Sequence, residues 1–445
     1  MKTRTSYTYR QIVKVAYPIF ITLVVQNLIQ VINTAFLGHV GEVELGASAI
    51  AGIFYIVIFT LAFGFSSGSQ ILIGRRNGEQ NYHQIGEIVV YGALFLLVIA
   101  SGLFFFVRTC SRWFLLPVLS SPDILEASVT YLNYRIFGIF FACINVMFRA
   151  FYTGTTSTRI LSINALIMAC TNIVLDYLLI FGNWGFPQMG LTGAALASVS
   201  AEAISVLFFL SYTFLTVDLK KYGFKSIQSG GWRVIRNILN VSLSLMVQYL
   251  IQMGTWLIFF LTIEKMGEQS LAASNIIRSI YILFAVPVFA LSTTTNTLVS
   301  NTIGAGRSDE VISLVWKIVR AAISLALLFI LILLLFPNVA LSLYTSDQLL
   351  ISVARSSLFV IVATLPVMAF GNVFFSSVSG TGNTRTALWI EIGVMFIYLF
   401  YVWMMVNLFQ APLAVCWGAE TLYAGVIFIF SYFYLSSNRW KNRKI

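Results

Sequence analysis

The sequence predicts an all-α polytopic membrane protein with twelve transmembrane helices in two six-helix lobes that a parallel internal repeat relates. Three observations support this fold class: the composition, the spacing of the apolar segments and the repeat. Hydrophobic residues make up 59% of the 445 residues and charged residues 10%, whereas an ordinary soluble domain carries about 25% charged residues. With a mean hydropathy of +0.88, the chain belongs in a bilayer.

Apolar segments of helical length follow one another along the chain, and about 20 apolar residues suffice for a helix to cross a membrane. The expected helices are, in order, residues 12–37, 45–73, 85–107, 127–152, 160–181, 191–215, 238–263, 271–299, 311–343, 350–378, 387–409 and 414–435. No gap between them is large enough for a soluble domain. We therefore expect a lobe at 1–217, a basic cytoplasmic connector at 218–236, and a lobe with a short basic tail at 237–445.

The two lobes repeat each other at one constant offset that holds through three separate loops. The matched positions are Gly41-Glu42 with Gly267-Glu268, Leu45, Ala47, Ser48 and Ile50 with Leu271, Ala273, Ser274 and Ile276, Gly78 with Gly304, and Gly154-Thr155 with Gly380-Thr381. Each half has an even number of helices, so both halves enter the membrane from the same side. A parallel repeat of this kind is typical of transporters that work by alternating access.

Basic residues indicate the orientation, because cytoplasmic loops carry an excess of Lys and Arg. With a cytoplasmic N-terminus, most of the 27 Lys and Arg lie inside, among them Arg75, Arg76, Arg159, Lys220, Lys221, Arg307, Arg385 and the tail residues Arg439, Lys441, Arg443 and Lys444. The other side holds Arg108, Arg112 and Lys265 beside Glu42, Glu44 and Glu268. We expect both termini in the cytoplasm and a multi-pass protein of the cell membrane, the inner membrane in a bacterium.

Asp176 is the candidate functional residue that the sequence singles out. It lies within the apolar segment 160–181, four residues after Asn172, so both side chains share one face of a helix. A carboxylate at membrane depth costs roughly 2.5–3.5 kcal/mol on insertion scales, and such a residue usually faces the protein interior and handles ions, protons or substrate. The alternative is that Asp176 lies near the helix end and reaches the water interface.

Several motifs, taken in order, resemble the multidrug and toxic compound extrusion (MATE) family. They are Thr34-Ala35-Phe36-Leu37-Gly38-His39-Val40-Gly41, Arg149-Ala150-Phe151-Tyr152-Thr153-Gly154, Gly190-Leu191-Thr192-Gly193-Ala194-Ala195, Gly304-Ala305-Gly306-Arg307 and Ser379-Gly380-Thr381-Gly382-Asn383-Thr384-Arg385. Each motif alone is weak, but their order and spacing together are specific and span almost the whole chain. The resemblance implies a twelve-helix, two-lobe exporter driven by protons or sodium, in a superfamily that also contains lipid-linked oligosaccharide flippases.

The resemblance implies a cation or proton site in the first lobe, closer to the DinF-like than to the NorM-like branch. Asn172 and Asp176 match the Asn and Asp of that branch, while Tyr131 matches a cavity tyrosine and Ser198 a common Thr. The sequence departs from the family at Asn33, where an Asp is usual. It departs again at Gln248, where the NorM-like branch is acidic, so we expect no carboxylate site of that type in the second lobe.

Other polar residues in the expected helices have more than one interpretation. Residues that could line a substrate cavity are Glu202, Gln26, Gln252, Gln248, Asn275 and Arg278, although amides in membrane helices equally serve as interhelical hydrogen bonds. Glu202 and Glu420 either contact an ion or substrate or remain buried and neutral. Glu391 lies near a helix start, where we expect solvation at the interface.

From the residues and the resemblance together we expect a secondary active exporter, a cation-coupled antiporter of amphipathic organic and often cationic compounds, coupled to protons through Asp176. The alternative is a flippase for a lipid-linked oligosaccharide, which needs a more cationic cleft than Arg278 supplies. We do not expect an enzyme, because no nucleophile–base or metal constellation occurs, and Cys110, Cys143, Cys170 and Cys416 are scattered.

Protons are the expected coupling ion and sodium the alternative, because a sodium site needs several hard oxygen ligands and Asn33 removes one carboxylate. Desolvation favours the neutral form of a lone carboxyl group, which then needs no further ligands. No cofactor is expected. The expected partners are small organic substrates and the lipid bilayer, with no nucleic acid, and the chain is expected to be a monomer.

Overall fold

The computed structural model describes residues 7–224, 230–345 and 347–441, and these residues form helices with no strand. The chain divides into two compact units. We call Ile21–Met246 the N-terminal unit, and Met1–Phe20 together with Val247–Ile445 the C-terminal unit. The predicted all-α fold class is confirmed.

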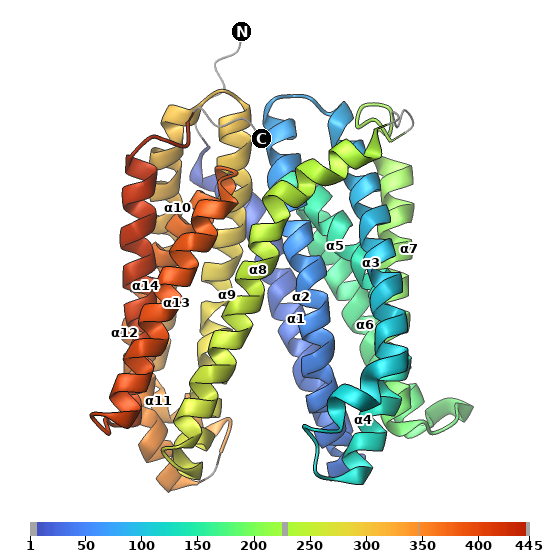
Figure 1. Ribbon diagram of the computed structural model, residues 1–445, viewed down its shortest axis with the longest axis vertical. Helices are drawn as coiled ribbons and strands as arrows, with labels where there is room; N and C mark the ends of the chain where they lie inside the picture. Colours follow the sequence, from blue (N-terminus) through green and yellow to red (C-terminus); the bar gives the residue numbers. More distant parts are fainter. Residues whose placement is uncertain (1–6, 225–229, 346, 442–445) are drawn as a thin grey trace. The chain divides into compact units, whose positions relative to one another are not determined.

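The N-terminal unit contains the end of α1 (Tyr9–Gly38), the start of α8 (Gly231–Glu264) and all of the helices between them (Figure 1). These are α2 (Glu42–Gly78), α3 (His83–Leu115), α4 (Pro122–Arg135), α5 (Gly138–Gly154), α6 (Arg159–Phe181) and α7 (Gly190–Thr216), with the short 3₁₀ helix η1 (Asn183–Gly185) before α7. The helix α2 packs against α5, and α6 packs along α7. This α6–α7 pair carries most of the candidate site.

The C-terminal unit is built around α12, which packs against α9 and α14. Its helices are α9 (Glu268–Gly304), η2 (Ser308–Glu310), α10 (Val311–Leu335), α11 (Pro337–Ser342), α12 (Gln348–Gly380), α13 (Thr384–Asn407) and α14 (Leu413–Ser436). Both ends of the described chain meet this unit near η2, because Lys441 pairs with Asp309 at 2.6 Å and Lys317 Nζ lies 3.5 Å from the Tyr7 carbonyl oxygen.

The helices account for the predicted membrane spans. Among the described residues, eleven helices are long and apolar enough to cross a membrane, and the total is twelve when a bent pair forms one span. That pair is α4 and α5, which meet at an angle of 52°. The span predicted at 127–152 therefore consists of two helices that meet at a bend.

The bend between α4 and α5 makes room for charged side chains. A Cβ atom at Gly138, the first residue of α5, would collide with the guanidinium of Arg135 and the carboxylate of Glu202. The chain therefore bends next to a glycine, and the bend allows Arg135 to reach Glu202 on α7.

The helix predicted at 311–343 is also divided, because α10 ends at Leu335 and α11 begins at Pro337. Proline lacks a backbone N–H and disfavours helical geometry in the residue before it. Phe336 accordingly has φ −130° and ψ 49° and leaves the helix. Pro337 marks this break in the sequence, but the apolar residues on both sides of it led to the prediction of one helix.

The first helix of each repeat is shared between the compact units. The unit boundaries fall within α1 after Phe20 and within α8 after Met246, and these positions are equivalent under the constant offset of the repeat. The expected lobes at 1–217 and 237–445 follow the two copies of the repeat, whereas each compact unit takes one part of α1 and one part of α8. The start of α8 contacts α2 closely at Gly64 and Gly68, where a Cβ atom would collide with Met246 and Ser242.

Candidate functional site

The buried carboxyl group of Asp176 is the centre of a polar cluster in the N-terminal unit. Asp176 lies on α6 and is 0% exposed, so it belongs to the interior and not to the water interface. In the amide orientation that satisfies its neighbours, Asn33 Nδ2 donates to Asp176 Oδ2 at 2.8 Å and to Asn172 Oδ1 at 3.0 Å. Asn172 Nδ2 in turn lies 3.5 Å from Ser198 Oγ on α7. The structure thus brings four of the five predicted coupling residues together.

The second carboxylate oxygen of Asp176, Oδ1, is buried and has no hydrogen-bond partner among the described residues. None of the ion pairs formed by the described residues involves Asp176. A buried carboxylate with neither a counter-charge nor a full set of donors is strongly unfavourable. The site is therefore chemically suited to bind a proton or another cation at Oδ1.

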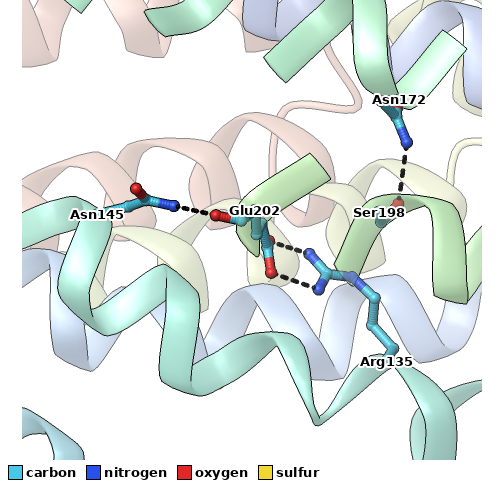
Figure 2. Close-up of polar contacts among 5 residues, drawn as sticks. All are labelled: Arg135, Asn145, Asn172, Ser198 and Glu202. Atoms are coloured by element: carbon cyan, nitrogen blue, oxygen red, sulfur yellow. Dashed lines mark hydrogen bonds and ion pairs between the residues drawn. The ribbon is translucent and has the colours of Figure 1, made fainter. Parts of the chain in front are cut away.

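Tyr131 lies on α4, one turn before Arg135, which forms a buried ion pair. The Tyr131 side chain packs against a core cluster that includes Leu37 of α1 and Ile180 of α6. Figure 2 shows the two parallel contacts of the ion pair, in which Arg135 Nη1 donates to Glu202 Oε2 at 3.0 Å and Nη2 donates to Oε1 at 2.5 Å. Glu202 is therefore neither a free cation ligand nor a lone neutral acid, because Arg135 neutralises it.

The ion pair is supported from both sides. The guanidinium of Arg135 lies 3.8 Å above the centre of the Tyr55 ring, a cation–π contact. Asn145 Nδ2 donates to the backbone carbonyl of Glu202 at 3.1 Å (Figure 2). Sequence reasoning missed Arg135, although a basic residue within an expected span and an acidic residue within another are a signal for such a pair.

The remaining predicted cavity residues are distributed over both units. Asn275 is exposed and donates to the Leu271 carbonyl of its own helix at 3.1 Å. Arg278 is half-buried and lies 5.0 Å from the centre of the Phe260 ring. Gln26 is half-buried on α1, whereas Gln248 and Gln252 belong to the part of α8 in the C-terminal unit.

The C-terminal unit contains two further buried carboxyl groups. Glu391 is 0% exposed, so the prediction that it is solvated at the interface is wrong. It accepts hydrogen bonds from Gln252 Nε2 at 2.9 Å and from the Tyr423 hydroxyl at 3.1 Å. Glu420 is 5% exposed and accepts hydrogen bonds from two tyrosines. The sequence did not show these partners, because they come from helices far apart along the chain.

The MatE family model matches this chain twice, over residues 18–178 and 244–404. Together the two segments cover well over half of the chain. They have equal lengths, and the second begins at the constant offset that the loops had revealed. The family match therefore supports the parallel repeat independently of the loop motifs.

Two relatives of this chain have the same name. A protein of Thermotoga maritima named "Probable multidrug resistance protein NorM" is 25% identical to this chain, over 98% of the chain and 94% of the relative. A protein of Synechocystis with the same name is 26% identical over 63% of this chain and 61% of the relative. Both identities are too low to transfer a substrate.

Solved structures share the fold over nearly the whole length. A MOP superfamily transporter from Pyrococcus furiosus, described as having a binding pocket of reverse polarity, superposes with a TM-score of 0.88 at 18% identity, covering 96% of each chain. The eukaryotic MATE transporter AtDTX14 superposes with a TM-score of 0.85 at 17% identity, covering 97% of this chain and 96% of that one. At these identities the likeness concerns the fold alone.

Proposed function

The chain belongs to the MatE family, whose members are membrane transporters and not enzymes, and we propose that it is a cation-coupled exporter of amphipathic organic, often cationic, compounds. The relatives' name, "Probable multidrug resistance protein NorM", supports export of drug-like compounds. The presence of Asn172 and Asp176 in the first lobe supports a place near the DinF-like branch. We also propose that the protein is a monomer in the cell membrane.

The unpartnered carboxyl oxygen of Asp176 is the observation that carries this proposal. A fully buried carboxyl group that receives one amide hydrogen bond and no counter-charge favours the protonated form while the site is closed. When water enters, the ionised form becomes accessible and attracts a cationic substrate. Proton and substrate therefore compete for one carboxyl group, which is the requirement for exchange. The ligands shift the protein between conformations only through their different affinities for each.

Protons fit this site better than sodium. In the orientation that satisfies its neighbours, the amide of Asn33 donates to Asp176, and it brings no second negative charge to the site. The described residues hold no group of three or more His, Cys, Asp or Glu side chains with metal-binding proximity. A sodium ion would thus depend on Asp176, Asn172 and Ser198, whereas a proton needs Asp176 alone.

The coupling ion is tested with purified protein in liposomes that contain a fluorescent organic cation. A pH gradient imposed without sodium is expected to drive transport, and a sodium gradient at clamped pH is expected to drive none. The opposite result would refute proton coupling. Asn33→Asp supplies a second carboxylate and is expected to add sodium dependence.

Transport of a lipid-linked oligosaccharide in place of the dye would instead favour the flippase.

We also propose that both termini lie in the cytoplasm, because the basic loops and the basic tail share that side. The proximity of Lys441 to Asp309 and of Lys317 to Tyr7 supports a common side for the two ends. We therefore expect activity from a reporter that works only in the cytoplasm when it is fused after Ile445. An active reporter of the extracytoplasmic type at the same position would contradict this topology.

A further inference from the structure

Glu420 lies about two turns into α14, among aromatic side chains from three other helices. Tyr281 of α9 donates to Oε2 at 2.9 Å, and Tyr398 of α13 donates to Oε1 at 2.9 Å. The rings of Trp256 and Phe259 on α8 lie 6.1 Å from the Tyr281 ring and 6.0 Å from the Tyr398 ring, respectively. Both carboxyl oxygens are thus held by hydroxyl groups inside an apolar, aromatic shell.

Glu391 has a similar environment on α13. Tyr423 lies 3.1 Å from Oε1 and 3.4 Å from Oε2, and Gln252 Nε2 donates to Oε1 at 2.9 Å. Tyr423 follows Glu420 by three residues, so both occupy one face of α14. Its ring lies 6.4 Å from that of Tyr398. Two tyrosines therefore connect the two carboxyl groups.

Within the part of the chain that the structure describes, neither carboxyl group forms an ion pair. The basic residue nearest in sequence to Tyr281 is Arg278, whose guanidinium lies over Phe260. The other hydrogen bonds that α14 forms nearby join uncharged groups. Thr421 bonds to Thr364 of α12, the Val415 carbonyl to Tyr401 of α13, and Cys416 to Met266.

The hydroxyl partners suit a carboxyl group that changes its protonation state. A tyrosine hydroxyl can donate or accept a hydrogen bond, whereas an amide N–H or a guanidinium only donates. Around the ionised Glu420, Tyr281 and Tyr398 both donate. After protonation, one carboxyl oxygen donates to one tyrosine while the other tyrosine still donates. With the heavy atoms in the same positions, both carboxyl oxygens therefore keep a hydrogen bond in either form.

Gln248 is a further buried polar side chain on this part of α8. It lies one turn before Gln252 on the same face of α8, and it is only 4% exposed. Its Oε1 atom is buried and has no hydrogen-bond partner among the described residues. A buried acceptor without a donor is costly, and Gln248 shares its helix face with Gln252, the residue that hydrogen bonds to Glu391.

We propose that Glu391 and Glu420 form a second proton-binding site, held entirely within the C-terminal unit. Binding converts one carboxylate and one proton into a carboxylic acid, and release reverses the reaction, with no other reactant. The use of this site during transport rests on the proposed exporter function. Proton binding itself does not, and it can be measured without any substrate.

The test is infrared spectroscopy of the full-length protein in liposomes, recorded as the pH is changed. The C=O band of protonated carboxyl groups is expected to lose intensity as the pH rises. Glu391→Gln and Glu420→Gln are each expected to remove part of that titrating band. Tyr398→Phe takes one hydrogen bond from Glu420, so it is expected to shift the remaining band without removing it. Glu268→Gln, at an exposed glutamate, is the matched control and should leave unchanged the part of the band that titrates near neutral pH.

Two outcomes would overturn the second site. A band that is identical in wild type, Glu391→Gln and Glu420→Gln would mean that both groups stay ionised. If these variants remove part of the C=O band, but that part does not change with pH in the wild type, the two carboxyl groups would be a permanently neutral, structural pair. Because Asp176→Asn removes a different part of the band, a failure at Asp176 and a failure at this second site are distinguishable in the same spectra.

Discussion

Asp176→Asn is expected to abolish exchange driven by a pH gradient and to leave folding and membrane insertion intact. The amide has nearly the shape of the carboxyl group and still offers an oxygen to Asn33, but it cannot take up a proton. A tenfold difference in proton affinity between two conformations supplies about 1.4 kcal/mol to the transport cycle, and the variant loses this contribution. The measurement is dye efflux from liposomes together with the thermal unfolding midpoint in detergent.

Two companion variants make the Asp176 result interpretable. Asp176→Glu keeps a titratable group but adds a methylene to a fully buried position, so partial transport is expected. Asp309→Asn changes an exposed aspartate that pairs with Lys441, and full transport is expected. If Asp176→Asn transported at the wild-type rate, another carboxyl group would carry the coupling, and Glu420 would be the first to examine.

Arg135→Met is expected to destabilise the N-terminal unit by about 3–5 kcal/mol, because removing one partner leaves Glu202 charged and buried. The side chains of Arg135 and Glu202 are 12% and 15% exposed, so water screens the pair only weakly. The double variant with Glu202→Met replaces both charges by apolar groups of similar volume, and most of the lost stability is expected to return. Unfolding free energies in mixed micelles, arranged as a double-mutant cycle, measure the coupling.

The control for this cycle is Arg112→Met, at a second ion pair of the same unit. Arg112 Nη2 lies 2.8 Å from Glu126 Oε1, but these side chains are 65% and 56% exposed. Solvent-exposed pairs contribute about 0–1 kcal/mol, so a small change is expected. If the losses from Arg135→Met and Glu202→Met simply added in the double variant, the two residues would be energetically independent, contrary to the geometry.

The sequence by itself determined the fold class, the repeat and the face shared by Asn172 and Asp176. These features depend on apolar length, on matched loops and on helical spacing, all of which are local or periodic along the chain. Pro337 also acts locally, through Phe336, but the prediction of one helix at 311–343 overlooked it. The family resemblance added Asn33, Ser198 and Tyr131 as neighbours of Asp176, and the structure gathers Asn33, Asn172, Ser198 and Asp176 into one cluster.

Only the tertiary structure decided which polar groups meet across helices. The pairing of Arg135 with Glu202, the enclosure of Glu391 by Gln252 and Tyr423, and the sharing of α1 and α8 between two units are not visible in the sequence. The reason is physical. A helix that is apolar on all sides carries no stripe that tells which face is inside, so its rotation is decided by small residues and interhelical hydrogen bonds. Those contacts exist only after the helices have assembled.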